Sequence, residues 1–156
     1  MCLVLSANTP EASLEDFFKK YGRKKSYTFY KCLSPRVSGK GYCTLFRGAP
    51  VRPGSRITED GYPAVYQSDG YDHLTCKWYK YPVIQGGGLH LFIDKRYACA
   101  ITPTSTFKVT VKRKDLIAYG GFDDFGDPES VVVRSYKLSR FSTYHIVSRL
   151  LEKLGR

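Results

Sequence analysis

Four acidic side chains lie close together in a stretch that also contains glycine and proline. Asp123, Asp124, Asp127 and Glu129 supply carboxylate oxygens, the ligands that calcium and magnesium prefer. Their spacing differs from that of an EF-hand loop, and the neighbouring glycine and proline are typical of a turn. Two interpretations stay open, a cation-binding loop and a plain acidic turn, and we favour the turn.

The cysteines do not form a metal-binding pattern. Cys2, Cys32, Cys43, Cys76 and Cys99 are widely separated and include no Cys-x-x-Cys pair. A structural zinc site needs ligands in pairs at short spacing. We therefore predict no structural metal, and we expect reduced thiols that act as small apolar residues.

The sequence contains no recognisable pairing of a nucleophile with a base. It has neither a G-x-S-x-G nor an H-E-x-x-H motif, and it contains only three histidines. His73 follows Asp72 in a tyrosine-rich stretch, where the two could act as an acid–base pair or could simply be solvated. His90 lies in an expected strand, and His145 lies in an expected helix near its surface.

The chain is strongly basic. It has 25 Lys and Arg against 14 Asp and Glu, a formal net charge of +11, and 15% aromatic residues. Such a charge attracts nucleic acid, anionic membranes or an acidic protein partner, and exposed tyrosines can stack on bases. No stretch approaches the roughly 18 apolar residues of a membrane span, and the first residues lack the basic region of a secretory signal. We therefore expect a cytoplasmic protein without a membrane partner.

The candidate contact residues lie beside or within expected loops. A basic run follows an expected helix, two further cations lie in a turn-rich segment after an expected strand, and the long loop 49–75 carries arginines and several tyrosines. A loop of this length is commonly functional. The predicted binding residues are Arg23, Lys24, Lys25, Arg36, Lys40, Arg52, Arg56, Tyr62, Tyr66 and Tyr71.

Hydrophobic periodicity predicts the secondary structure. A helix over Ser13–Tyr21 is expected, capped by Ser13, and a second, which Asp94 can cap, runs to about Ala100. A third covers Thr143–Leu154 with leucines on one side. Strands are expected over 26–33, 43–48, 75–83, 89–93, 107–112 and 130–138, and residues 1–5 could add a short one.

These elements predict an α+β domain. We expect a mainly antiparallel sheet of about six strands with two or three short helices, in a single domain over residues 1–156. The segment 75–83 is expected at the edge of the sheet, because Pro82 cannot donate a backbone hydrogen bond.

Three short blocks carry a family resemblance. LFRG at 45–48, PTST at 103–106 and PESVVV at 128–133 resemble the Arg, Ser-Thr-Ser and Glu blocks of ADP-ribosyltransferases. The resemblance implies that Arg47 would bind the phosphates of nicotinamide adenine dinucleotide (NAD), that Ser105 would support Arg47, and that Glu129 would be catalytic. The second block reads TST here, and Asp127 stands two residues before Glu129. The middle of the chain is also similar to small uncharacterised proteins of phages and bacteria.

Two function hypotheses follow. The first is a small basic non-enzymatic binding protein of phage or viral origin, without a cofactor, that occupies a nucleic acid or an acidic host protein in the host cytoplasm. The second is an ADP-ribosyltransferase-like enzyme, or an inactive relic of one, that binds NAD. The sequence contains no heptads and no small-residue interface pattern, so it gives no support for oligomerisation.

Overall fold

A computed structural model describes most of the chain. The described residues are 2–36, 41–44, 50–59, 64–85, 89–101, 105–121 and 128–155. The strands are β1 (Cys2–Leu5), β2 (Ser26–Pro35), β3 (Tyr42–Thr44), β4 (Pro50–Val51), β5 (Arg56–Thr58), β6 (Ala64–Asp72), β7 (Lys77–Gln85), β8 (Leu89–Phe92), β9 (Thr106–Lys112), β10 (Leu116–Gly121), β11 (Glu129–Val133) and β12 (Ser135–Ser142). The helices are α1 (Pro10–Tyr21), α2 (Lys95–Ile101), the 3₁₀ turn η2 (Arg113–Asp115) and α3 (Thr143–Lys153).

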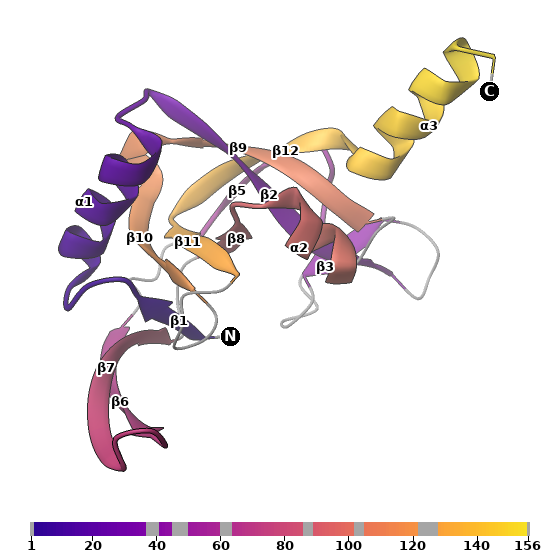
Figure 1. Cartoon of the computed structure of the whole chain (residues 1–156). Helices are drawn as coiled ribbons and strands as arrows, with labels where there is room; N and C mark the ends of the chain where they lie inside the picture. The colour runs from indigo at the N-terminus through magenta and orange to yellow at the C-terminus, as the bar shows by residue number, and fades with distance from the viewer. Residues whose placement is uncertain are drawn as a thin grey trace.

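The strands form one antiparallel sheet. Its order is β5-β12-β9-β2-β8-β11-β10-β1-β7-β6. Outside this order, β3 pairs with β2 and with β4. Every pairing between the described strands is antiparallel. Figure 1 shows the sheet curving, with β2, β9 and β12 above β8, β10 and β11.

The predicted α+β fold of about six strands is wrong. The described residues alone contain twelve strands in one sheet, with three α-helices, so the fold is dominated by its sheet. The segment 49–75, expected as a loop, holds β4, β5 and β6, and β10 (Leu116–Gly121) was not among the expected strands. β4 and β5 have two or three residues, β6 is exposed along most of its length, and β10 is buried along nearly all of it. None of them therefore shows the apolar–polar alternation on which the expectation depended.

The main core is formed by side chains of α1 and of β2, β8, β9, β10, β11 and β12. In β9, the side chains of Phe107, Val109 and Val111 are buried, and those of the intervening residues are exposed. This alternation confirms the predicted inward face of 107–112. The apolar run over residues 131–133 is also fully buried, as predicted.

Helix α1 closes one end of this core. The ring centroid of Phe17 lies within 6.0 Å of those of Tyr27, Phe29 and Tyr119, so the helix joins the sheet through an aromatic cluster. Aromatic pairs of this kind add to the hydrophobic gain of burial. Figure 1 shows α1 lying along β10 at the left of the sheet.

The start of α1 differs from the prediction. Thr9, not Ser13, is the N-cap, because its hydroxyl accepts the N–H of Ala12 over 3.1 Å and Pro10 begins the helix. Proline suits the first helical position, where its missing N–H leaves no bond unmade. Ser13 is buried instead, and its hydroxyl accepts the N–H of Tyr119 over 3.0 Å. The residue therefore links the helix to β10.

Two elements extend from the body of the molecule. The β6–β7 hairpin extends downward from the other strands of the sheet, and α3 extends to the upper right (Figure 1). β7 pairs with β6 along its whole length but with β1 only at residues 83–85, so residues 77–82 lie at an edge of the described sheet, as predicted for the segment 75–83. The predicted C-terminal helix is present, but Leu150, Leu151 and Leu154 on it are exposed.

The N-terminal strand runs unusually close to β10. A Cβ atom added to Gly120 would stand 1.8 Å from the carbonyl oxygen of Val4, a distance that no side chain tolerates. Leu5 is opposite Gly120 in the register. Glycine at this position lets β1 enter the sheet between β10 and β7.

Substitution Gly120→Ala should therefore cost about 3 kcal/mol of unfolding free energy or more, because a backbone must move. Urea denaturation measures this cost. Gly22→Ala is the control: Gly22 has a φ of +77° but nothing within 4 Å of an added Cβ. With ψ of 163°, its backbone lies in a region that glycine alone readily adopts, so an alanine there should cost about 1 to 3 kcal/mol without any clash. Equal losses in the two variants would contradict the close approach of β1.

Candidate functional site

Two basic runs meet at one end of the sheet. Residues 23–25 (RKK) precede β2, and residues 112–114 (KRK) end β9 and begin η2. β2 and β9 pair antiparallel over seven residue pairs, and the N–H of Arg113 donates to the carbonyl oxygen of Lys25 over 3.0 Å. The beginning of one strand thus lies beside the end of the other, and the two runs share one surface.

A cleft of about 400 Å³ lies where the runs meet, and we call it the basic cleft. It is lined by Lys25, Ser26, Lys112, Arg113 and Lys114. All four cationic residues are exposed, and none makes an ion pair with a carboxylate in the described ranges. Four like charges at one place repel each other, so an anion placed there would relieve this repulsion.

A second cleft of about 270 Å³ adjoins the first through Ser26, which lines both. Lys24 lines it, together with Phe17 and Tyr21 of α1 and Tyr27 and Phe29 of β2. The hydroxyl of Tyr27 donates to the carbonyl oxygen of Gly22 over 2.7 Å and accepts the N–H of Lys24 over 2.9 Å. These bonds fix the backbone that presents the first basic run.

Two of the predicted binding arginines are already paired. Arg23 donates to both carboxylate oxygens of Glu15, over 2.7 and 2.6 Å, and its guanidinium lies 4.6 Å from the ring centre of Phe18. Arg56 donates to the hydroxyl of Ser135 over 2.9 Å and lies 3.9 Å from Asp115. Their charges are therefore partly compensated.

The remaining predicted residues lie elsewhere. Arg36 and Arg52 share a separate cleft of about 280 Å³ beside β3 and β4. Tyr66 and Tyr71 lie on the β6–β7 hairpin and are exposed. Lys40 and Tyr62 fall outside the described residues. Of the predicted residues that the structure describes, only Lys24 and Lys25 line the basic cleft or its neighbour.

The prediction missed the second half of the basic cleft. Lys112, Arg113 and Lys114 follow an apolar alternating run, just as residues 23–25 precede one. In an antiparallel pair, the residues before the first strand meet those after the second. This placement of the two runs is a signal in the sequence that could have identified the cleft.

One more basic residue, Lys31, points into the sheet rather than out of it. Its ammonium group donates to the carbonyl oxygen of His90 over 2.9 Å, which joins β2 to β8. Burial lowers the pKa of its amine to about 8. We interpret Lys31 as a structural residue whose amine is held at the contact between β2 and β8, away from the basic cleft.

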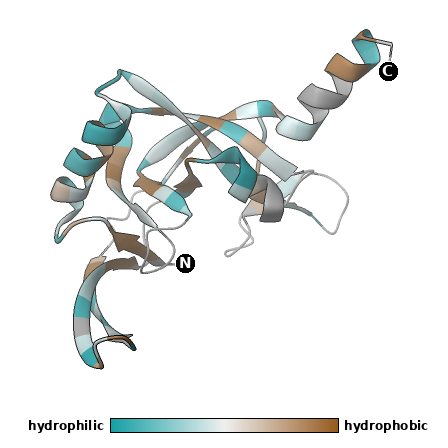
Figure 2. Ribbon diagram, viewed as in Figure 1, coloured by the Kyte–Doolittle hydropathy of each residue, from teal (hydrophilic) through white to brown (hydrophobic). Residues whose placement is uncertain are grey.

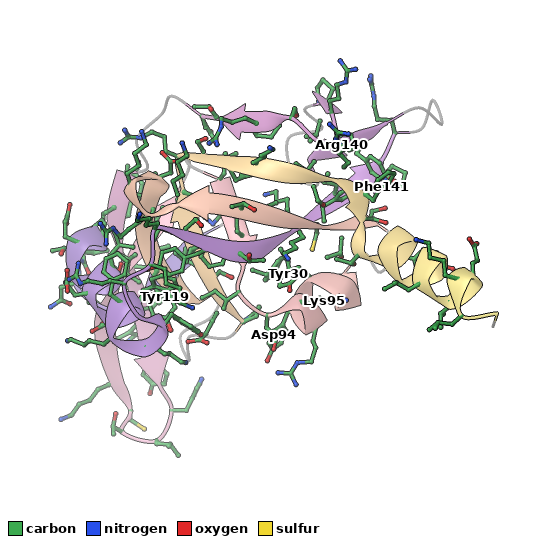
Figure 3. All side chains as sticks on the ribbon, turned by 90° about the horizontal axis from the view of Figure 1, so that it is seen from above. Tyr30, Asp94, Lys95, Tyr119, Arg140 and Phe141 are labelled. Carbon is green, nitrogen blue, oxygen red and sulfur yellow. The ribbon has the colours of Figure 1, made fainter. Side chains whose placement is uncertain are left out.

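Glu129 lies at the first residue of β11 and binds three donors. The ammonium group of Lys20 donates over 2.6 Å, the hydroxyl of Tyr21 donates over 2.5 Å, and the hydroxyl of Tyr119 also donates to the carboxylate. Lys20 and Tyr21 end α1, while Tyr119 belongs to β10, seen beside α1 in Figure 3. We call this arrangement the Glu129 clamp, because it fastens the helix to two strands.

The clamp holds its carboxylate in the charged form. Burial favours the neutral acid, but the hydrogen bonds from Lys20, Tyr119 and Tyr21 outweigh it and keep the pKa of Glu129 below its usual value. Burial, together with the bond to Glu129, raises the pKa of both tyrosines. The tyrosines therefore stay protonated and remain donors.

Of the three residues implied by the family resemblance, the structure describes Ser105 and Glu129, which lie at different places in the sheet. Ser105 is buried just before β9, and Glu129 lies on β11, three strands away. Along the register, Ser105 is also four residues from the level of Glu129, so about 14 Å across and about 13 Å along the sheet separate them. Arg47 lies outside the described residues. The enzyme hypothesis stays a prediction.

Among the metal-ligand and acid–base candidates, the structure describes the side chains of Glu129 and His73. Asp123, Asp124 and Asp127 lie outside the described residues. In the described ranges, no three His, Cys, Asp or Glu side chains group as metal ligands. The ring of His73 packs edge-on against Tyr71, with centroids 5.0 Å apart.

Comparisons with protein-family models, curated proteins and solved structures gave no match. Among the described residues, no helix has the length and apolar character needed to cross a membrane.

Substitution Glu129→Gln should lower the unfolding free energy by about 2 kcal/mol at neutral pH, the scale of hydrogen bonds to a charged group. Because the folded pKa is depressed, this stabilisation is present above the unfolded value of about 4.3 and is lost as pH falls through the folded value. Urea denaturation at several pH values measures both effects.

The variant should lose less stability than the wild type on acidification. Glu152→Gln is the matched control, because Glu152 is an exposed glutamate of α3. If Glu129→Gln behaves like this control, the clamp does not stabilise the fold.

Proposed function

We propose that this protein binds nucleic acid without catalysis, through phosphate contacts made at the basic cleft. One observation carries the proposal: Lys25, Lys112, Arg113 and Lys114 line one cleft and have no carboxylate partner in the described chain. Unpaired cations that converge on a concave surface attract phosphate.

The surface beyond the cleft favours a polymer over a small anion. The exposed side of the neighbouring strands carries Lys108 and Thr110 on β9, Thr28 on β2 and Lys137 on β12. Thr28 and Lys137 both lie opposite Thr110, so these side chains follow one another across three strands. Figure 3 shows β2, β9 and β12 side by side. Lysines and hydroxyls can all contact phosphate oxygens, which suits an extended backbone.

Phosphate contacts at the basic cleft depend on charge and do not distinguish one base from another. Lysine and arginine at the basic cleft can pair with phosphates of any sequence, and phosphate contacts alone position a protein without specifying bases. We therefore expect binding that depends steeply on salt and weakly on base composition.

Substitution of Lys112, Arg113 and Lys114 together by alanine should weaken binding to an unstructured oligonucleotide. Each lost phosphate contact removes about 0.7 from the slope of log affinity against log salt for single strands, so three lost contacts should reduce the slope by about 2. Fluorescence anisotropy over a salt series measures the slope.

The control variant removes the same charge elsewhere. Lys19, Lys77 and Lys153 are exposed on α1, on the hairpin and on α3, and alanine at all three should leave the slope nearly unchanged. Equal losses in the two triple variants would reduce the proposal to a general effect of net charge. Absence of salt-dependent binding in the wild type would overturn it and leave an acidic protein as the partner to test.

A further inference from the structure

The β6–β7 hairpin carries an unusual share of exposed apolar surface. We call residues 64–85 the hairpin arm. Of the eleven large hydrophobic residues that are exposed in the described chain, five lie on it. They are Val65, Tyr66, Tyr71, Leu74 and Trp78. The arm extends away from the sheet and mixes hydrophilic and hydrophobic residues along its length (Figures 1 and 2). Clustered exposed apolar residues mark an interaction surface.

The arm is electrically neutral in a strongly basic chain. Two acids, Asp69 and Asp72, balance two lysines, Lys77 and Lys80, whereas the whole chain carries +11. Two copies of such a chain repel each other over most of their surfaces. The arm is a place where they can approach without that repulsion.

The outer edge of the arm is open. β6 is the last strand of the sheet in the described chain and is nine residues long. It contains no Lys, Arg or Pro, the residues that usually protect an edge from pairing. The opposite edge strand, β5, has only three residues and carries Arg56. Residues 77–82 of β7 pair with β6 alone, but they contain Lys77, Lys80 and Pro82, so β6 is the described edge best suited to accept another strand.

We propose that two copies of the chain pair antiparallel through β6, with a twofold axis at Ser68. In this register Val65 lies opposite Tyr71 of the second copy, and Tyr66 lies opposite Gly70. Pairs of aromatic and β-branched side chains stabilise a sheet, and an aromatic ring can cover a glycine on the facing strand. Gln67 lies opposite Asp69, so its amide can donate to the carboxylate.

Other registers fit less well. A shift of pairing by one residue places facing side chains on opposite faces of the sheet. An axis at Asp69 sets this carboxylate against its own copy, which is destabilising. An axis at Gln67 leaves Tyr71 opposite no residue of β6. The axis at Ser68 alone pairs all nine residues of the strand without facing like charges.

The size of the contact predicts a weak dimer. One added strand pair, with the aromatic side chains along it, buries less than the roughly 800 Å² per partner of a standard interface. The dimer should therefore form and dissociate over an accessible range of concentration. Both copies contribute the same surface, as in a closed twofold assembly.

Sedimentation velocity across a concentration series, in moderate salt and without nucleic acid, tests the pairing. The wild type should shift from monomer to dimer as concentration rises. Substitution Ser68→Lys places two ammonium groups against each other at the axis and should raise the dimer Kd at least about tenfold. Circular dichroism should show an unchanged fold.

Substitution Gln67→Lys adds the same charge one residue away. It faces Asp69 of the second copy, so the Kd should stay the same or fall. If Ser68→Lys raises the dimer Kd and Gln67→Lys does not, the proposed register is supported. A wild type that stays monomeric throughout, or equal weakening by both variants, overturns it, whatever the result of the oligonucleotide experiments.

Discussion

The antiparallel pairing of β2 with β9 is the contact on which the rest of the structure depends. One side of this pair supplies Phe29 and Val109 to the core, and the other side remains exposed and carries lysine and threonine. Its end joins two basic runs that are far apart in the sequence. The apolar side stabilises the pair, and that stability holds together cations that would otherwise repel one another. The pairing of β2 with β9 therefore fixes both the apolar core and the position of the basic cleft.

Sequence reasoning succeeded where a local pattern was strong. The alternation over 107–112 identified the inward side chains, and Asp94 was expected to cap α2, where it accepts the N–H of Arg96 over 2.7 Å. It failed over 49–75, because β4 and β5 have only two or three residues and so no period to detect, and β6 is exposed along most of its length and has no buried face. β5 forms by pairing with β12, which is distant in the sequence, whereas β4 and β6 pair with strands close to them in the chain.

For a similar reason, only one of the two basic runs at the candidate site could be predicted from the sequence. Lys24 and Lys25 could be identified as a basic run, but their partners across the cleft follow from the register of two strands some eighty residues apart. Glu129 was expected in a loop and is instead the first residue of β11, bound by Tyr21 and Tyr119. A carboxylate that looks free in sequence can be a structural contact once helix and sheet meet.

The position of β1 has a consequence for the order of folding. Its four residues are made before the rest of the sheet, yet they lie between β10 and β7 and pair with residues near 84 and 121. Until β10 has left the ribosome, one side of this strand has no partner. Such distant pairings form slowly, because the intervening chain must be ordered first. The hairpin arm, whose two strands are neighbours in sequence, can form early, and insertion of β1 into the sheet is a late step that fixes the arm to the body.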